Sequence, residues 1–333
     1  MTGSLLRRIG AGVAFFSGAV FFSYLSSAFF NVVEGLYHGT LQLEECFSLG
    51  KFNLSGVAIL GLTGVCLLLE VFWMGWKESS LARIFGRWDH SLKTDLFYFF
   101  LMCAGITPVL GFFLSLGTGY LINEVIKEHL GLNLLKGVGM PLQFGVIVLV
   151  NTFIFYWHHR LFHSRPLWRF HQIHHAAEHF NLITNFRNHP LDLAVRTILY
   201  TLPAAVLGLN PAVILAYTAV AGVITCFQHS ELDWRMPFIE RYVIIGSSGH
   251  RLHHGVEREH YNKNFGILVL WDWMFGTHAP PMPEKIPIGV AGDPDLHNTD
   301  SPALSLWRVT ERGFRELFLQ AARALLGRYS GAR

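Results

Sequence analysis

Long apolar stretches constrain the fold of this chain more than any other feature of its sequence. Four of them are close to or above the roughly 20 residues that a helix needs to cross a bilayer. They lie at residues 10–33, 54–76, 96–122 and 140–157. A fifth apolar region, residues 191–227, is too long for one helix and is interrupted by Pro203, Gly208 and Pro211. This region predicts a hairpin of two short helices that spans the membrane or re-enters it.

The composition also indicates a membrane protein. Hydrophobic residues make up 51% of the 333 residues and charged residues 15%, whereas soluble domains carry about 25% charged residues. These values argue against a soluble globular protein, a disordered chain and a coiled coil. The net charge of +3 is too small to indicate nucleic-acid binding. We therefore predict an all-α fold, a polytopic membrane helical bundle.

Basic residues predict the orientation of this bundle. Arg7 and Arg8 precede the first stretch, residues 77–94 carry four Lys or Arg residues, and the segment after residue 157 is basic as well. The positive-inside rule places all three on the cytoplasmic side of a bacterial inner membrane or the endoplasmic reticulum. A signal peptide is the alternative for the N-terminus, but the apolar run continues to about Val33 without a clean cleavage site, which favours a retained span.

Histidine is abundant and unevenly distributed. The chain has 18 histidines against 23 Asp and Glu residues together, and most of the histidines lie between positions 158 and 278. Three clusters stand out, and the side chains of each would share one face of a helix. They are the H-x-x-x-H pair His159 and His163, and two H-x-x-H-H boxes, His171, His174, His175 and His250, His253, His254. His189 and His229 lie between the clusters.

So many imidazoles at one membrane face point to bound metal. They would repel one another if protonated and are costly to bury unpaired, and a cation resolves both problems. Eight or more histidines exceed the ligand number of one zinc site, which favours two ions. None of the four cysteines lies in a cluster, so thiolate iron–sulfur sites are excluded. We expect a histidine-rich metal-binding cap at the cytoplasmic face, with iron favoured because open positions on a metal pair suit oxygen activation.

Two other kinds of protein are alternatives to an oxygenase. A histidine-rich membrane metal transporter would carry polar residues in the middle of its spans, but here the spans hold few, such as Glu70 and Asn151. A zinc-dependent membrane hydrolase would need a motif such as H-E-x-x-H, which is missing, and fewer ligands.

The clusters, in this order and with these gaps, resemble the fatty acid hydroxylase/sterol desaturase superfamily of integral-membrane di-iron oxygenases. The resemblance covers about residues 150–278 and includes Asn188-His189-Pro190, Gln228-His229-Ser230 and a closing Asn264-Phe265-Gly266 followed by Trp271-Asp272 and Phe275-Gly276-Thr277, where Phe265 replaces the usual Tyr. The segment His174–Asn181 is similar to a stretch of the alkylglycerol monooxygenase branch, in which Glu178 would bind or orient an iron.

The resemblance implies a ligand set for two iron ions, with O2 as co-substrate. The implied ligands are His159, His163, His171, His174, His175, His250, His253 and His254, with His229 as a ninth. His189 is a further candidate, whose alternative role is to close a turn. Asp272 is a candidate for orienting a ligating imidazole, as outer-shell carboxylates do, and its alternative role is in a helix cap or turn. Arg160 and Arg251 lie inside boxes and are expected to pair with carboxylates.

The expected activity is hydroxylation or desaturation of an unactivated C–H position of a lipid: a sterol, a fatty acyl chain or an ether lipid. Phe155, Trp157, Phe162 and Phe170 are placed to wall an apolar substrate slot, and packing between helices is their alternative role. Because no dinucleotide or iron–sulfur motif occurs, electrons would come from a separate ferredoxin, or from cytochrome b5 with its reductase.

We predict three regions: transmembrane helices over residues 1–139, a catalytic region over residues 140–280, and a tail over residues 281–333. Apolar and basic residues alternate at helical spacing in the tail from Leu304 to Tyr329. This pattern predicts an amphipathic helix that lies at the membrane interface or packs on the body of the protein.

Overall fold

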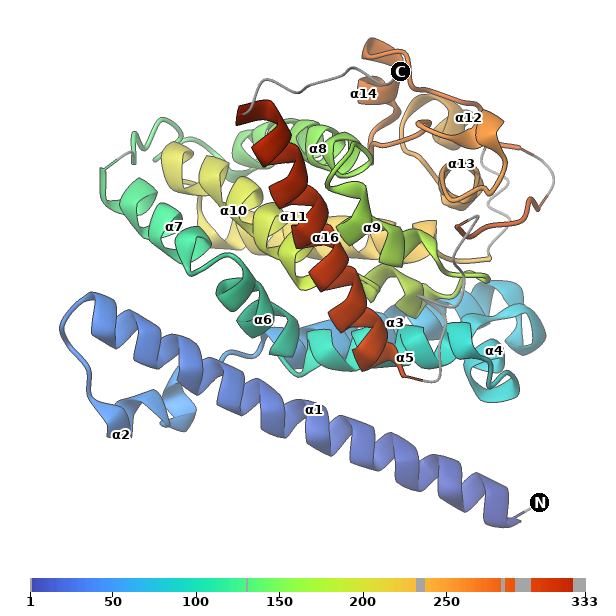
Figure 1. Cartoon of the computed structure of the whole chain (residues 1–333), viewed down its shortest axis with the longest axis horizontal. Coiled ribbons are helices and arrows are strands. Elements are labelled where there is room, and N and C mark those ends of the chain that lie inside the picture. Colours follow the sequence, from blue (N-terminus) through green and yellow to red (C-terminus); the bar gives the residue numbers. More distant parts are fainter. Residues whose placement is uncertain (1, 130, 232–236, 283–284, 291–300, 326–333) are drawn as a thin grey trace.

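The computed structural model describes residues 2–129, 131–231, 237–282, 285–290 and 301–325. These residues form helices and no β-sheet (Figure 1). The longest helices are α1 (Thr2–Tyr37), α3 (Ser55–Met74), α8 (Met140–Phe162), α10 (Pro190–Leu207), α11 (Pro211–Gln228) and α16 (Pro302–Leu325). Shorter helices are α2 (Leu43–Cys46), α4 (Ser80–Gly86), α5 (His90–Cys103), α6 (Ile106–Leu114), α7 (Thr118–His129), α9 (Trp168–His175), α12 (Pro237–Tyr242), α13 (Ser247–His253) and α14 (Val269–Met274). Single 3₁₀ turns are η1 (Leu49–Lys51), η2 (Trp76–Glu78), η3 (Leu182–Phe186) and η4 (Arg258–His260).

Five of the described helices are long and apolar enough to cross a membrane: α1 from Gly10 onward, α3, α8, α10 and α11. The all-α membrane bundle expected from the sequence is confirmed. The predicted hairpin is the pair α10–α11. Gly208 ends α10 in the left-handed conformation (φ 66°), and the Asn210 side chain caps α11 by accepting the Ala212 N–H. Pro203 lies inside α10 without ending it.

The third apolar stretch differs from the prediction, because it is not one straight span. Helices α5 and α6 meet at an angle of 82°, and α7 begins at Thr118. The bend lies at Gly105, which has φ 68°, a conformation that favours glycine. Its carbonyl accepts the Ser26 hydroxyl of α1 at 2.9 Å, and a Cβ at this position would lie 2.6 Å from the Ser26 Oγ. The close approach of α1 therefore requires glycine here.

Contacts between helices show which helix ends lie together. Ser80 of α4 and Ser230, which follows α11, both donate hydroxyl protons to the buried carboxylate Glu70 of α3. At the opposite end of the bundle, the Asn133 and Leu135 amides donate to the Val206 and Leu207 carbonyls of α10. The bent pair α5–α6 with α7 therefore carries the chain from one end of the bundle to the other.

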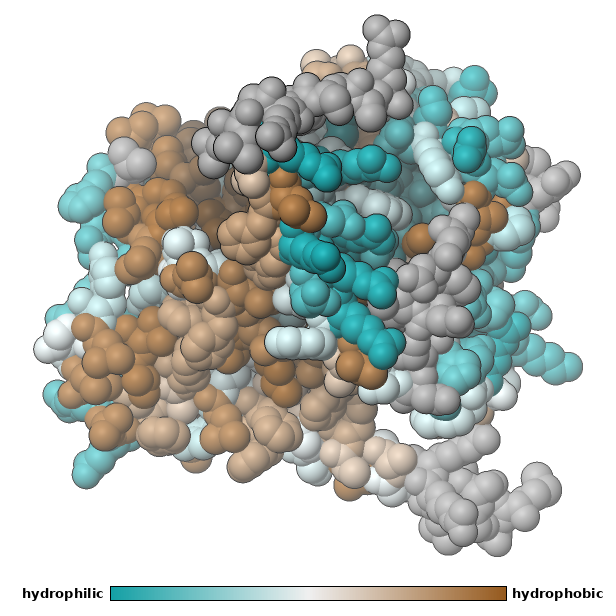
Figure 2. Space-filling view, in the orientation of Figure 1, coloured by the Kyte–Doolittle hydropathy of each residue, from teal (hydrophilic) through white to brown (hydrophobic). Residues whose placement is uncertain are grey.

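The two ends of the bundle differ in polarity. Figure 2 shows hydrophobic surface over α6, α7 and α10 and hydrophilic surface over the part that contains α12, α13 and α14. The N-terminal end of α1 lies at the same side of the molecule as these short helices (Figure 1). Exposed apolar side chains such as Phe72, Leu68 and Leu215 on the spanning helices are suited to contact lipid.

Helix α16 packs on the body of the protein, which was one of the two arrangements left open for the tail. It crosses α9 and α5 (Figure 1). Val309 is buried, and a Cβ at Gly313 would lie 2.5 Å from the Phe170 ring. Arg169 Nε donates to Glu316 Oε1 at 2.7 Å. Trp307 and Phe318 remain exposed on its outer side.

Candidate metal centre

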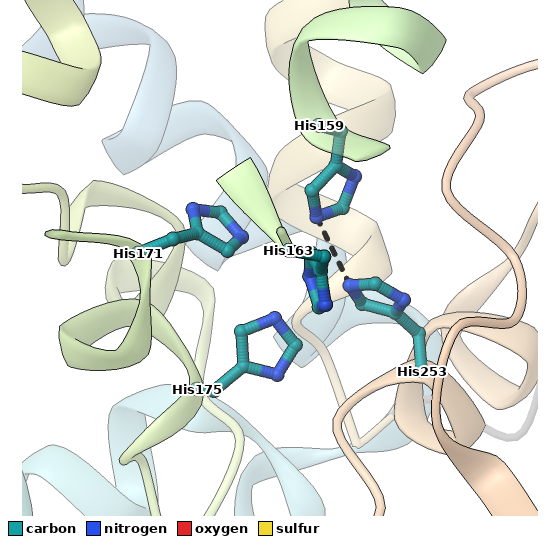
Figure 3. A group of neighbouring side chains, drawn as sticks. All are labelled: His159, His163, His171, His175 and His253. Carbon is teal, nitrogen blue, oxygen red and sulfur yellow. Dashed lines mark hydrogen bonds between the residues drawn. The ribbon is translucent and has the colours of Figure 1, made fainter. Parts of the chain in front are cut away.

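Nine histidines from α8, α9, α11 and α13 converge in two groups. The first group is His159, His163, His171, His175 and His253, and the second group is His174, His229, His250 and His254. Within each group, one ring nitrogen per residue can be chosen so that all lie within 4.8 Å of one another. Figure 3 shows the five rings of the first group facing a common centre. All but His163, which is half-buried, are buried.

Each H-x-x-H-H box contributes to both groups. On α9, His171 and His175 are one helical turn apart and join the first group, whereas His174 joins the second. On α13 the assignment is reversed: His250 and His254 join the second group and His253 the first. A short helix therefore presents an i, i+4 pair to one group and the i+3 residue to the other. Helices α9 and α13 together link the two groups.

Backbone carbonyls determine which nitrogen of each anchoring ring carries the proton. His159 Nδ1 lies 2.8 Å from the Phe265 carbonyl, and His253 Nδ1 lies 2.6 Å from the Lys263 carbonyl. A carbonyl only accepts, so both Nδ1 atoms donate and both Nε2 atoms carry lone pairs. The two Nε2 atoms nevertheless face each other at 3.0 Å (Figure 3). A cation between the rings satisfies this arrangement.

The second group shows the same pattern. His229 Nδ1 donates to the Thr225 carbonyl at 2.8 Å, which leaves a lone pair on Nε2. That Nε2 lies 3.1 Å from His174 Nε2 and 3.0 Å from His250 Nε2. His254 Nε2 lies 3.1 Å from His250 Nε2. Four imidazole nitrogens thus lie within 4.8 Å of one another, close enough to share one metal ion.

Further ring nitrogens are buried without a hydrogen-bond partner among the described residues. In the first group these are Nε2 of His163, His171 and His175. A buried polar atom without a partner is destabilising by about 1–3 kcal/mol, so several in one place indicate a ligand. Unprotonated imidazole nitrogen is a good donor to iron, copper, nickel and zinc. The residues present therefore fit a pair of metal ions.

Burial keeps these imidazoles neutral. It lowers the pKa of His253 to about 3 and that of His229 to about 4. It also lowers the pKa of His174, His175 and His254 well below 6.5, and neighbouring histidines add to the effect. Neutral rings are the form that binds metal.

A cavity of about 280 Å³ connects the two groups to the interior of the bundle. Five histidines of the two groups line it, namely His159, His171, His174, His229 and His250. Its other walls come from the spanning helices, with Ile59 of α3, Phe155 of α8 and Ala221 of α11 among them. Of the four aromatic residues expected to wall a slot, only Phe155 does so. Phe162 and Phe170 are buried in helix packing, and Trp157 packs against Phe275.

Residues 144–277 match the fatty acid hydroxylase family model. The stretch that contains all nine histidines is therefore similar to this family.

Three relatives lie in the same superfamily. The chain is 33% identical over 157 residues to an ornithine lipid hydroxylase, OlsE, of Rhizobium tropici, covering 46% of this chain and 47% of the relative. It is 36% identical over 128 residues to an alkylglycerol monooxygenase of Danio rerio, covering 38% of this chain and 28% of the relative. It is 30% identical over 143 residues to a lathosterol oxidase of Rattus norvegicus, covering 41% of this chain and 46% of the relative. The matches thus span less than half the length of each relative. No solved structure matches the chain.

One carboxylate within residues 144–277 has a role that the sequence did not indicate. Asp192 of α10 lies between two histidines: Oδ2 accepts from His171 Nδ1 at 2.8 Å, and Oδ1 lies 3.0 Å from His158 Nε2. It thereby orients the His171 ring with Nε2 toward the first group. The sequence does place Asp192 close to a histidine, in the segment His189–Asp192. The contact with His171 could not be read from it, because the two residues are 21 positions apart.

Asp272 follows the second of its two expected roles and holds a turn. It contacts no imidazole among the described residues, and instead accepts the Phe265 and Gly266 amides at 2.8 and 2.7 Å and the Thr277 hydroxyl at 2.7 Å. These bonds hold the loop whose Phe265 carbonyl accepts from His159. Its influence on the ring therefore passes through the backbone.

The structure does not bring His189 or Glu178 to either group. His189 Nδ1 accepts the Leu191 amide as the cap of α10, and Nε2 bonds Thr310 Oγ1 of α16 at 2.9 Å. Both ring nitrogens are therefore occupied, in agreement with the alternative that it closes a turn. Glu178 is exposed at the surface.

The two arginines inside the boxes differ. Arg251 pairs with Glu231, with Nη2 and Oε1 2.6 Å apart. Arg160 donates to the Tyr156 hydroxyl at 2.8 Å and lies over the Trp157 ring instead of pairing with a carboxylate. Both hold together elements of residues 144–277, which match the family.

Proposed function

We propose that this protein is an integral-membrane di-iron oxygenase that hydroxylates or desaturates an unactivated C–H position of a lipid. The observation that carries the proposal is the pair of all-histidine groups, in which ring nitrogens with lone pairs face one another. In the first group, Nε2 of His163, His171 and His175 is also buried without a hydrogen-bond partner among the described residues. The relatives support it, because their names describe lipid hydroxylation, alkylglycerol monooxygenation and lathosterol oxidation.

The nine histidines of the two groups would hold the two irons. When bound, the irons would supply O2 reduction and hydrogen abstraction, for which no side chain has the required redox chemistry. The residues around them position and insulate this centre. Asp192 and the carbonyls of Phe265, Lys263 and Thr225 fix the ring tautomers. The cavity among the spanning helices would admit an apolar substrate and exclude water.

The setting of this reaction is also a proposal. We infer that the metal centre faces the cytoplasm of a bacterial inner membrane or the endoplasmic reticulum. Electrons would come from a separate ferredoxin, or from cytochrome b5 with its reductase. We propose the division into residues 1–139, 140–280 and 281–333 as a division by role. The three regions are not separate packing units, because α16 of the tail packs on α9 of the catalytic region.

Metal analysis of the purified full-length protein tests the proposal. We expect two irons per chain. Bound zinc with hydrolytic activity would support a hydrolase, and exchangeable metal that moves across vesicle membranes would support a transporter. Either result would contradict the oxygenase.

The His174→Ala variant tests the ligand assignment. It removes one of only four nitrogens in the second group, so we expect loss of one iron or both and of lipid oxidation. His260→Ala provides a control, because His260 is also a buried histidine but belongs to neither group. A fully active, fully loaded His174→Ala protein would reject the assignment.

A further inference from the structure

Helix α10 carries two charged residues within a candidate membrane span, and only one of them is accounted for. Asp192 bonds His171 and lies beside His158. Arg196 follows one turn later on the same face of the helix. No carboxylate among the described residues lies within ion-pairing distance of its guanidinium, although it is half-buried. A charged residue inside a span is costly and usually functional.

Arg196 lines the cavity that reaches the histidine groups. Tyr200, one further turn along α10, lines the same cavity. Its hydroxyl is buried without a hydrogen-bond partner among the described residues. Its ring lies against Phe155 and His158, with centroids 6.4 and 6.5 Å apart. One cavity therefore contains a guanidinium without a carboxylate and a phenol without a hydrogen-bond partner among the described residues, together with five histidines of the two groups.

The chemistry of these groups selects an anion. A guanidinium offers a planar set of N–H donors that matches the oxygens of a phosphate or carboxylate, and a phenol adds one O–H donor. The carboxylate in the cavity lining, Asp192, has both oxygens directed at histidines. Around the donors, Ile59, Phe186 and Ala221 supply apolar walls. A cavity with this lining suits a molecule that has an anionic group joined to a hydrocarbon chain.

We propose that Arg196 and Tyr200 bind the anionic head of the lipid substrate, so that the enzyme acts on a phosphate- or carboxylate-bearing amphiphile. This inference rests on the proposed function, because it assigns the cavity to the substrate of the metal centre. Tyr200 donates to the same anion as Arg196, and the hydrocarbon chain lies along the apolar wall.

Two probes with the same chain and different heads test the inference by binding alone. The probes are 1-oleoyl lysophosphatidate and 1-oleoyl glycerol, and the protein is the full-length, metal-loaded chain in phosphatidylcholine nanodiscs. We expect the phosphate probe to bind at least about tenfold more tightly, because hydrogen bonds to a charged partner are the stronger kind. Equal affinities for the wild-type protein would overturn the inference, whatever any variant does.

Variants assign the preference to residues. Arg196→Gln should abolish the tenfold preference and leave the affinity for 1-oleoyl glycerol unchanged, Arg196→Lys should keep part of it, and Tyr200→Phe should reduce it. Arg87→Gln is the control, because it removes a positive charge from an exposed position, and it should retain the full preference. A preference that survives in Arg196→Gln would overturn the assignment.

Inorganic phosphate distinguishes a lipid head from a free anion. At millimolar concentration it should fail to displace lysophosphatidate, because the apolar wall contributes to binding only for the lipid. Displacement would reassign the site to a soluble anion and overturn the substrate class. The binding test requires no turnover, so it separates this inference from the proposed function. If the protein purifies without iron but keeps the preference for the phosphate probe, the proposed oxygenase is contradicted and the head-group site stands.

Discussion

Asp192 shows how much of the metal centre depends on a residue that is not a ligand. Its carboxylate holds His171 Nδ1 at 2.8 Å, and it also lies beside His158. Groups that orient a ligating imidazole typically change metal affinity by 10- to 100-fold when they are removed. The carboxylate makes the His171 ring present Nε2 to the other four rings of the first group.

We therefore expect Asp192→Asn to weaken iron binding by about 10- to 100-fold, because the amide accepts less strongly and no longer carries a charge. Iron content after dialysis against a graded chelator measures the effect. Glu316→Gln is the control, since it removes a carboxylate that pairs with Arg169 at the surface. Unchanged iron retention in Asp192→Asn would show that His171 is oriented without it.

The buried histidines also make the stability of the metal-free protein depend on pH. Burial holds the pKa of His253 at about 3 and that of His229 at about 4, whereas the unfolded chain titrates near 6.5. Below pH 6.5 the unfolded state binds more protons than the folded state, so the free energy of unfolding falls as the pH falls toward 4. Thermal unfolding of the metal-free protein from pH 8 to pH 4 measures this dependence. A midpoint that stays constant from pH 7 to pH 4.5 would contradict it.

At the scale of the element, α11 forms one wall of the cavity and its packing allows little variation. Ala221 lines the cavity, and a Cβ at Gly222 would lie 3.1 Å from Leu62 of α3. Small residues on this face therefore leave space for a ligand and allow α3 to approach.

We expect Ala221→Phe to lower kcat/KM for the lipid by at least about tenfold with iron content unchanged, because the larger side chain occupies cavity volume without touching a ring nitrogen. Val220→Phe is a matched control, since Val220 is the neighbouring residue and is exposed on the outer side. Equal losses in both variants would indicate a general packing defect rather than a blocked cavity.

The bend between α5 and α6 gives a second prediction for an element. Gly105→Ala adds a Cβ 2.6 Å from the Ser26 Oγ at a positive φ. We expect a loss of about 1 kcal/mol or more in stability, read as a lower thermal midpoint in detergent. Gly61→Ala in α3 is the control, because its Cβ would meet nothing within 4 Å. A Gly105→Ala midpoint equal to that of the control would show that α1 moves aside freely.

At the scale of the whole molecule, the bent pair determines the sidedness of the protein. If α5 and α6 together count as one crossing, the described chain has up to six crossings. An even number returns the chain to the side from which it started. The contacts of Glu70 with Ser80 and Ser230 place the ends of α3 and α11 together, which agrees with a crossing by the bent pair.

We expect reporters fused to the N-terminus and to the C-terminus to lie on the same, cytoplasmic side. A phosphatase fusion, active only outside the cytoplasm, and a fluorescent fusion, active only inside, measure this directly. Termini on opposite sides would mean that the bent pair re-enters the membrane without crossing it.

The sequence by itself determined the class of this protein. Apolar length required spanning helices, because a bilayer leaves backbone groups no partner except their own helix. Histidine spacing indicated a metal site, because buried neutral imidazoles need a ligand for their lone pairs. The positions of α1, α3, α8 and the hairpin α10–α11 followed from these two patterns.

Only the tertiary structure decided how the boxes divide between two groups, that Asp192 rather than Asp272 touches an imidazole, and that the third stretch bends at Gly105. Each depends on residues distant in sequence: Asp192 lies 21 residues from His171, and Ser26 lies 79 residues from Gly105. Periodicity reports which face of one helix is apolar or rich in histidine, but it carries no information on which other helix that face will meet.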